Sequence, residues 1–321
     1  MHIPRRMFLA AAPAAALTAG EVRAQQPWRP SRPVRLVVPF TPGGTTDLLG
    51  RLAARGMEAH LGQPVVVENR GGAGGAIGSE LVAKSAPDGH TIVLSNIASQ
   101  AIGPAVSRHI PYDPVKDFVP IGLIAAVPSA IVVAASSPIR TLPELVEQAK
   151  SRQVRFGSTG IGTSSHVKLE LLNRAAGVQI LHAPYRGSAP AIADILAGQI
   201  DGLIAAVPDV GRNEMLRLLA VTTPARASRW PDVPSVREHG FDSLVATNWF
   251  GLSGPAGMPV GTADALWSAL SKGLATPDAV DRLLDFGASP NSMTRQEYTA
   301  LIASEVSRWA KVAEDAQIRG D

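Results

Sequence analysis

The chain of 321 residues contains no cysteine. Disulfides, thiolate metal sites and cysteine nucleophiles are therefore excluded. The seven histidines are scattered singly, and a metal site needs two or three converging ligands, so we expect no metal and no cofactor. Runs of basic residues are also missing, with 30 Lys and Arg against 27 Asp and Glu. Because a nucleic-acid surface requires a concentrated basic patch, we expect no nucleic-acid partner.

Long apolar runs are missing too, apart from a short one near the N-terminus. Residues 7–20 are apolar, but they fall short of the roughly 20 residues that span a bilayer as a helix. Arg5 and Arg6 precede this stretch, and small residues at 22 and 24 suit a signal peptidase. We predict a cleaved signal peptide, residues 1–24. The arginine pair fits the twin-arginine pattern and also an ordinary signal, so both export routes stay open.

The remaining chain has ample material for a core, since 45% of all residues are hydrophobic and 18% are charged. Short β-branched segments at 34–38, 64–68 and 91–95 alternate with helical patterns at 47–60 and 77–84. Alternation of this kind predicts an α/β fold with parallel sheets.

The length predicts about two domains, yet no flexible linker divides the chain. Two apolar segments, 118–126 and 244–252, are flanked by turn residues and are predicted to cross between two lobes. Two crossings make one lobe discontinuous, so residues 27–125 and 248–321 form lobe 1 and residues 126–247 form lobe 2. Paired crossing strands act as a hinge, and ligand sites favour such interdomain clefts.

The first candidate binding loop lies where the first predicted strand ends and the first helix begins. Glycines allow a tight turn with uncovered N–H groups, and the first-turn N–H groups with the helix dipole attract an anion. From sequence alone, a plain turn that binds nothing explains the pattern equally well. The candidate residues here are Phe40, Pro42, Gly43, Gly44, Thr45, Thr46 and Asp47.

A second loop with the same composition follows the predicted strand at 154–156. If both loops face one cleft, two helix N-termini from different lobes point at the same anion, and hydroxyls, that of Ser164 among them, satisfy carboxylate oxygens. Helix capping is the alternative interpretation. The candidates in this loop are Ser158, Thr159, Gly160, Gly162, Thr163 and His166.

Four further residues complete the candidate site. Tyr185 could close over a ligand, and Ser188 could cap the next helix with its N–H groups facing the cleft. Trp249 lies at the second crossing, where it lines the cleft or packs in the core. Ser95 ends the third predicted strand.

Two enzyme-like patterns carry less weight. A hydrolase would pair Ser158 or Ser164 with His166 or His182, but the loop is not a G-x-S-x-G nucleophile elbow, so we expect no catalysis. The glycines at 71–78 have G-x-G-x-x-x-G spacing and follow the second strand, whereas a dinucleotide fingerprint follows the first. We interpret them as close backbone packing at the edge of the cleft.

Taken together, these segments resemble the Bug family, the binding proteins of tripartite tricarboxylate transporters. The matching stretches run in order through nearly the whole chain after the leader. They are residues 32–47, 61–75, 87–91, 112–114, 117–118, 157–166, 184–188, 219–222 and 249–252.

The resemblance implies a two-lobed periplasmic binding fold of the second type. It implies that the two glycine loops grip one carboxylate of the ligand, partly through backbone and ordered water. Ligands of the family include dicarboxylates, tricarboxylates, acidic amino acids and aromatic acids. The implied partner is a membrane permease of the tripartite tricarboxylate type or a sensor kinase, and we expect a monomer.

One segment departs from the family pattern. Many relatives carry a Phe-Asp pair after the strand near residues 201–204, whereas this chain has Ala205 and Ala206 followed by a shorter segment. That region borders the cleft, so we expect the far end of the ligand to differ, in favour of an apolar or aromatic acid.

Overall fold

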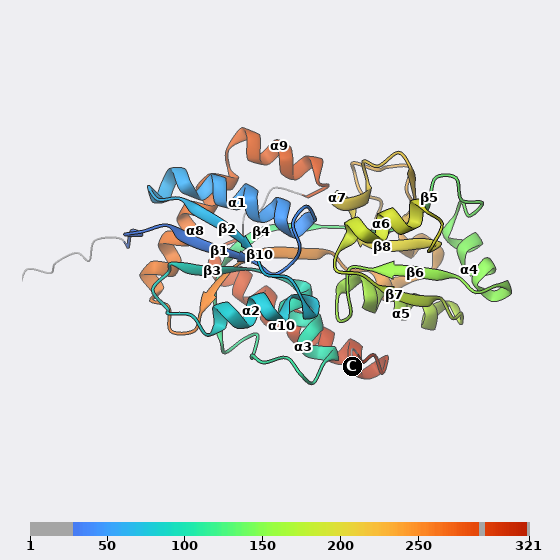
Figure 1. Cartoon of the computed structure of the whole chain (residues 1–321), viewed down its shortest axis with the longest axis horizontal. Coiled ribbons are helices and arrows are strands. Elements are labelled where there is room, and N and C mark those ends of the chain that lie inside the picture. Colours follow the sequence, from blue (N-terminus) through green and yellow to red (C-terminus); the bar gives the residue numbers. More distant parts are fainter. Residues whose placement is uncertain (1–27, 289–292, 320–321) are drawn as a thin grey trace, which may run out of the picture.

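Two α/β lobes, each built on a five-stranded sheet, make up the chain in a computed structural model that describes residues 28–288 and 293–319 (Figure 1). The predicted signal peptide, residues 1–24, lies outside the described residues. Across the two described ranges, no helix is both long and apolar enough to cross a bilayer.

The sheet of lobe 1 has the order β2-β1-β3-β10-β4. Its first three strands are parallel, and β10 runs antiparallel to both β3 and β4. The β-branched run predicted as the first strand forms β1, whose apolar side chains are all buried because helices cover both faces of the sheet. The strands are β1 (Val34–Val38), β2 (Val65–Asn69), β3 (Thr91–Asn96), β4 (Phe118–Val127) and β10 (Asn248–Pro255), with helices α1 (Thr45–Leu61), α2 (Ala76–Ala83), α3 (Gly103–Val106), α8 (Val260–Leu274), α9 (Pro277–Asp285) and α10 (Arg295–Asp315).

Lobe 2 repeats this arrangement in the order β7-β6-β8-β5-β9, with β5 antiparallel to its neighbours. Thr141 caps α4 as predicted, since its hydroxyl accepts a hydrogen bond from the Glu144 N–H at 3.3 Å. The strands are β5 (Ser129–Ala134), β6 (Arg155–Ser158), β7 (Leu181–Pro184), β8 (Gly202–Ala206) and β9 (Leu216–Val221), with helices α4 (Leu142–Ser151), α5 (Ser164–Ala176), α6 (Ser188–Leu196) and α7 (Val207–Val210).

The two lobes are joined by neighbouring antiparallel strands. β4 leads into β5 through Pro128 alone, and β10 returns beside β4 over its whole length. The two sheets thus show which strands belong to each lobe. The residue limits given above for the two lobes stay predictions.

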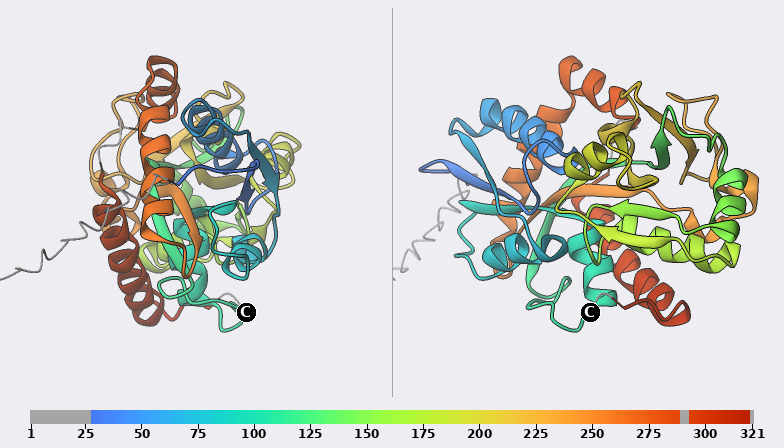
Figure 2. Two further views of the ribbon diagram at one scale, coloured as in Figure 1. Left: turned by 90° about the vertical axis from the view of Figure 1, so that its left-hand side faces the viewer. Right: turned by 45° about the vertical axis from the view of Figure 1, so that its right-hand side comes forward.

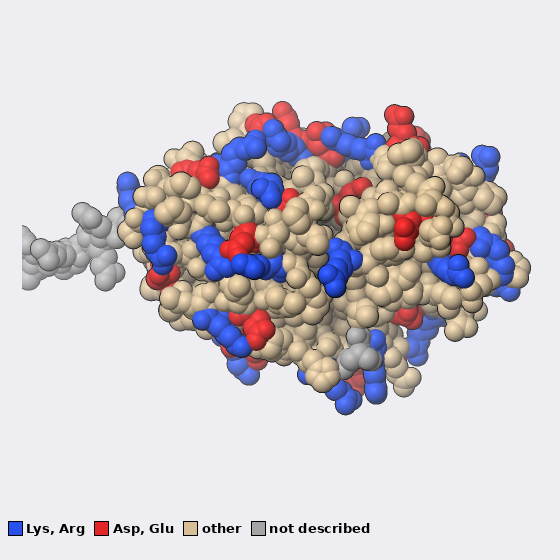
Figure 3. All heavy atoms as spheres, viewed as in Figure 1, with Lys and Arg blue, Asp and Glu red and all other residues tan. Residues whose placement is uncertain are grey.

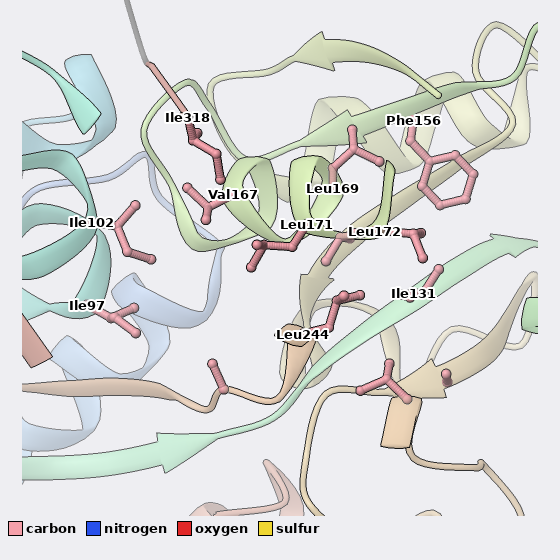
Figure 4. Close-up of a cluster of buried hydrophobic side chains, with 14 of the residues drawn as sticks. Ile97, Ile102, Ile131, Phe156, Val167, Leu169, Leu171, Leu172, Leu244 and Ile318 are labelled. Atoms are coloured by element: carbon pink, nitrogen blue, oxygen red, sulfur yellow. The ribbon is translucent and has the colours of Figure 1, made fainter. Parts of the chain in front are cut away.

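The last helix ties the lobes together away from these strands. In both Figure 1 and Figure 2 the red end of α10 lies beside α5 of lobe 2. Trp309 and Ala313 of α10 belong to one buried apolar cluster with Leu169 and Leu172 of α5, and Figure 4 shows Ile318 next to Val167 in the same cluster. The helix that follows the second loop, α5, is therefore anchored on its apolar face.

Candidate ligand-binding site

A cavity of about 80 Å³ lies between the two lobes and has room for several water-sized groups. Both glycine loops contribute to its wall, together with residues at the two strand crossings. Of the candidate residues named from the sequence, Phe40, Pro42, Gly44, Thr45, Thr46, Thr159, Thr163 and Ser188 line this cavity. The first and second loops therefore face one another across the cleft.

An outer groove of about 580 Å³ adjoins the cavity and shares Phe40, Pro42 and Thr159 with it. Gly160 and Tyr185 lie in this groove rather than in the cavity. The glycines at 71–75 form its other wall. Gly74 has φ +63°, and a Cβ there would lie 2.9 Å from the Ile161 carbonyl oxygen of the opposite lobe. This contact requires glycine and agrees with the interpretation of close backbone packing at the cleft edge.

Two of the candidate residues lie inside lobe 1 and line neither space. The Ser95 hydroxyl is 2.8 Å from the Tyr298 hydroxyl and 3.0 Å from that of Ser253. The Trp249 indole is buried and donates to the Glu305 carboxylate at 3.3 Å. Both side chains serve the packing between β3, β10 and α10.

Asp47 stabilises the first loop through hydrogen bonds within lobe 1. Its carboxylate accepts hydrogen bonds from the N–H of Gly43 at 3.0 Å, from Arg51 at 3.0 Å and from Asn69 at 2.9 Å. Burial by itself raises the pKa of Asp47, but these donors together hold the pKa below its ordinary value. Asp47 and Gly43 are thus parts of the loop's frame and do not line the cavity.

The N-terminus of α1 is already occupied by a carboxylate of the protein itself. The N-cap residue Gly44 has no side chain to cap the helix, and the Thr45 N–H and hydroxyl donate to Asp209 of lobe 2 at 2.7 and 2.6 Å. Burial raises the pKa of Asp209, against hydrogen bonds from Thr45 and Ser188 that lower it. The contact joins the lobes across the cleft.

The N-terminus of α5, by contrast, has no side-chain cap. The hydroxyl of the N-cap residue Thr163 donates to the Gly160 carbonyl oxygen at 2.6 Å, and Ser165 bonds to Thr159 within the loop. Ser164 is only 7% exposed and lines the cavity, and within residues 28–288 and 293–319 its hydroxyl has no hydrogen-bond partner. Because first-turn N–H groups have no partners inside the helix, this end offers an unsatisfied donor site to the cavity.

A stacked pair of histidines supports the second loop from below. His166 lies 4.3 Å from His182 between ring centroids, and its Nδ1 accepts from the Gly162 N–H at 3.3 Å. Burial, and then the neighbouring His182, lowers the pKa of His166 to about 4, and burial also lowers the pKa of His182. Both rings are therefore neutral at neutral pH.

The Ser–His pair expected of a hydrolase exists in part. The Ser158 hydroxyl is 2.6 Å from His182 Nε2. However, Ser158 is fully buried and lines neither the cavity nor the groove. No carboxylate in the described part of the chain is hydrogen-bonded to His182 to orient it, as a triad requires.

Several residues of the cavity wall were not singled out from the sequence. Asp209 lies in α7, directly after β8. Ala205 and Ala206 at the end of β8 also line the cavity, as their position near the cleft suggested. Ser129 and Asn248 also line the cavity and lie at the strand crossings, where a polar residue directly at a predicted crossing was the available signal. Asn96 at the end of β3 and Phe250 in β10 are two further lining residues.

Charge on the outside is mixed rather than concentrated. On the face shown in Figure 3, basic and acidic side chains alternate over both lobes. Within residues 28–288 and 293–319, no group of three or more histidine, aspartate or glutamate side chains is placed to hold a metal ion.

Comparison with known proteins identifies related chains over nearly the whole length. The model of the tripartite tricarboxylate transporter family receptor matches residues 49–318. A protein from the tcbD–tcbE intergenic region of Pseudomonas sp. strain P51 is 38% identical over 97% of this chain and 94% of its own. BugT of Bordetella pertussis is 36% identical over 89% of this chain and 90% of its own.

Solved structures agree with these matches. The periplasmic binding protein BugD has a TM-score of 0.86 at 34% identity, covering 90% of this chain and 99% of its own. An R. palustris protein solved with adipate gives the same values. MatC from Rhodopseudomonas palustris, with bound malate, has a TM-score of 0.84 at 31% identity and covers 88% of this chain and 99% of its own. The predicted two-lobed fold of periplasmic binding proteins and the resemblance to Bug proteins are confirmed.

Proposed function

The chain belongs to the tripartite tricarboxylate transporter family of receptors, and from this premise we propose that it captures a small carboxylate in the cavity between its lobes. The observation that carries the proposal is the free N-terminus of α5. There Ser164 lines the cavity, its buried hydroxyl has no hydrogen-bond partner among the described residues, and the first-turn N–H groups have no partners inside the helix. A ligand carboxylate satisfies these donors, and the helix dipole adds to the attraction.

The binding mode needs no basic side chain in direct contact with the ligand. Among the residues that line the cavity there is no Lys, Arg or His, so oriented N–H groups and hydroxyls supply the affinity. Hydrogen bonds to an ionised group contribute about 1.5–3 kcal/mol each. Three or four such bonds, with burial of the ligand's apolar part against Phe40, Ile97 and Phe250, account for micromolar binding at about 8 kcal/mol.

The ligand class follows from both the wall and the relatives. Related proteins have been solved with adipate and with malate, which makes dicarboxylates the first compounds to test. The small side chains of Ala205 and Ala206 leave room beside an apolar wall, so acidic amino acids and aromatic acids belong in the same panel. Release of this ligand to a membrane permease of the tripartite tricarboxylate type is the role we assign.

Export and the absence of catalysis are parts of the same proposal. We assign the protein to the periplasm, with residues 1–24 as the signal that is removed. Ser158 is used within its loop, where it also bonds to Gly160, and we assign it no nucleophilic role. A protein that only reports the ligand to a membrane sensor shares this site, and a transport assay in cells lacking the permease distinguishes the two roles.

The test is a thermal-shift screen of residues 25–321 against mono-, di-, tricarboxylates, acidic amino acids and aromatic acids. A ligand at a thousandfold excess over its Kd adds about 4 kcal/mol, which raises the midpoint by roughly 6 °C, because the unfolding entropy of a chain of about 300 residues gives about 1.6 °C per kcal/mol. Replacement of Ser164 by Ala removes one charge-assisted bond, so the Kd measured by calorimetry rises about 10–100-fold.

Ser304→Ala is the matched control, because Ser304 is exposed on α10 and its hydroxyl bonds only to the Leu301 carbonyl oxygen. It leaves the Kd unchanged. Stabilisation by neutral or cationic solutes but by no carboxylate would overturn the proposal.

A further inference from the structure

A lysine lies fully buried directly behind the wall of the cavity. Lys168 of α5 is 0% exposed, and its ammonium donates to the Ser129 hydroxyl oxygen at 2.8 Å and to the Ala246 carbonyl oxygen at 3.0 Å. In the described part of the chain, no carboxylate forms an ion pair with it. A buried charge without a partner is costly, so its position requires a reason beyond packing.

The hydroxyl of Ser129 has both of its lone pairs engaged. Its oxygen accepts from Lys168 at 2.8 Å and from the Asn248 side-chain amide at 2.8 Å. A hydroxyl has two acceptor lone pairs and one O–H donor, so only its proton is left to donate. Ser129 and Asn248 both line the cavity, so this O–H is available to an oxygen bound there.

We propose that Ser129, polarised by Lys168, forms a second subsite for a carboxylate or carbonyl oxygen of the ligand, and that this subsite binds the oxygen only while Lys168 is protonated. It lies at the hinge, since Ser129 begins β5 and Asn248 begins β10. The inference rests on the proposed function, capture of a small carboxylate. It names the ligand class as one with two oxygen-bearing ends, such as a dicarboxylate or an oxo acid.

The dependence on protonation follows from the charge behind Ser129. The Lys168 ammonium polarises the Ser129 hydroxyl and attracts a ligand anion. A neutral lysine amine keeps two N–H donors for Ser129 and Ala246 but carries no positive charge, so the hydroxyl becomes a weaker donor to the ligand. Anion binding and protonation of Lys168 therefore favour one another.

The surroundings of Lys168 place this switch near neutral pH. Burial lowers the pKa of Lys168 to about 7; Arg308 of α10 adds to the lowering, and Glu305 of the same helix opposes it. The groups in hydrogen-bond contact from β5 and from the segment before β10 are uncharged. A ligand anion thus takes up close to one proton when it binds above pH 7.

The first test needs no ligand. The chain contains six lysines, so the side-chain nitrogens of ¹⁵N-lysine-labelled protein can be followed by NMR from pH 5 to 11, with Lys168→Met identifying the signal. We expect the signal of Lys168 to titrate near pH 7. Titration of Lys168 above pH 9 overturns the inference, whatever the ligand.

The second test is calorimetry with malate and adipate at pH 6.5, 7.5 and 8.5, in HEPES and in Tris, which differ in ionisation enthalpy. We expect the Kd to rise about tenfold between pH 7.5 and 8.5, as uptake of one proton requires, and the heat to differ between buffers accordingly. In Ser129→Ala and in Lys168→Met, the Kd is higher at pH 6.5 and the pH dependence is lost.

Lys150→Met is the matched control, because Lys150 lies exposed on α4 beside Glu147, and it behaves as the unaltered chain. If Lys168→Met fails to fold, Ser129→Ala alone decides, since it leaves the lysine in place. Tight binding without pH dependence overturns the subsite and leaves the proposed function intact. Failure of every carboxylate at every pH overturns both.

Discussion

The two glycine loops have the same composition but different surroundings. Both follow a parallel strand and open a helix, α1 in lobe 1 and α5 in lobe 2. At α1 the Thr45 N–H and hydroxyl are bonded to Asp209 of the other lobe. At α5, Ser164 lines the cavity, and its buried hydroxyl has no partner in the described part of the chain. One helix end holds a protein carboxylate, and the other is the end at which we propose that a ligand carboxylate binds.

Because of this difference, the N-terminus of α1 serves the closure of the two lobes, and the N-terminus of α5 serves the recognition of the ligand. The Thr45–Asp209 contact crosses the cleft and is joined at the rim by the Thr41 hydroxyl, which donates to the Arg186 carbonyl oxygen at 2.9 Å. These bonds form only when the lobes are together. The α5 end, anchored through Leu169 and Leu172 in the apolar cluster with α10, supplies a rigid donor site. A helix N-terminus attracts anions in both cases, and the residue opposite decides which anion it receives.

The largest effect is expected when the N-terminus of α5 receives a carboxylate of the protein, as the N-terminus of α1 already has. In Ser164→Asp a carboxylate lies at the free end of α5, where it is favoured by the helix dipole and repels the ligand carboxylate. A like-charge contact costs several kcal/mol, so the Kd for malate or adipate measured by calorimetry rises at least about 100-fold. Thermal stability without ligand is unchanged or higher.

Ser304→Asp on the exposed face of α10 provides the control for added charge. If Ser164→Asp binds carboxylates as the unaltered chain does, the α5 end is not the ligand site and the two loops do not differ in the way described.

A smaller effect is expected from a change at the N-terminus of α1, where Asp209 is bound. Asp209→Asn keeps an oxygen that can accept from Thr45 but removes a negative charge from the cavity wall. A carboxylate ligand then binds more tightly, by about tenfold, since two such charges near a protein surface interact by at least 1 kcal/mol. Calorimetry with adipate measures this gain.

Asp209→Ala removes the acceptor as well, so the lobes lose a bond that holds them closed. Small-angle scattering of the ligand-free variant is expected to show a larger radius of gyration than Asp209→Asn. Equal radii in the two variants would contradict a role for Asp209 in closure.

The smallest effect is expected on the stability of the folded chain when the pH is lowered. The folded-state pKa of His166 is lowered to about 4 by burial and by His182, whereas an unfolded histidine has a pKa of about 6.5. Between these values the unfolded chain binds a proton that the folded chain does not, so stability is lost as pH falls from 6.5 towards 4. The carboxylate of Asp47, with a lowered pKa, keeps its stabilising contribution until the pH falls below about 3.9. Acid therefore weakens the second loop before the first.

Calorimetric melting at pH 7.5 and 5.0 checks this order. We expect the midpoint to fall by about 3 °C in the unaltered chain, because about 2 kcal/mol of stability is lost at about 1.6 °C per kcal/mol for a chain of about 300 residues, and by less in His166→Gln. His60→Gln, at an exposed position in the last turn of α1, is the control. An identical fall in the His166 variant would contradict the assignment.

Much of the fold was predictable because it is encoded locally. The β-branched runs became strands within one or two residues of the expected limits, and the two apolar segments predicted to cross between lobes became β4 and β10. Thr141 and Glu144 mark the start of α4 in sequence and in structure. Such signals involve residues that lie within a few positions of one another, so they survive without knowledge of the tertiary structure.

The candidate site was predictable only in part. Ser95 and Trp249 were proposed for the cleft and lie in the packing of lobe 1, because alternate residues of a strand face opposite sides and sequence does not say which side is the cleft. Asp209 was not considered, since a single aspartate in a short segment between strands has no pattern that distinguishes it from a solvated one.

The sequence by itself determined the α/β class, the two lobes, and the two loops of glycines and hydroxyls at helix starts. Tertiary structure alone decided that Asp209 occupies the end of α1, that Ser164 is left free, and that Lys168 lies behind Ser129. The reason is distance along the chain: 164 positions separate Thr45 from Asp209, and 39 separate Ser129 from Lys168. Hydrogen-bond partners so far apart are chosen by the packing of whole lobes, and no local pattern records that choice.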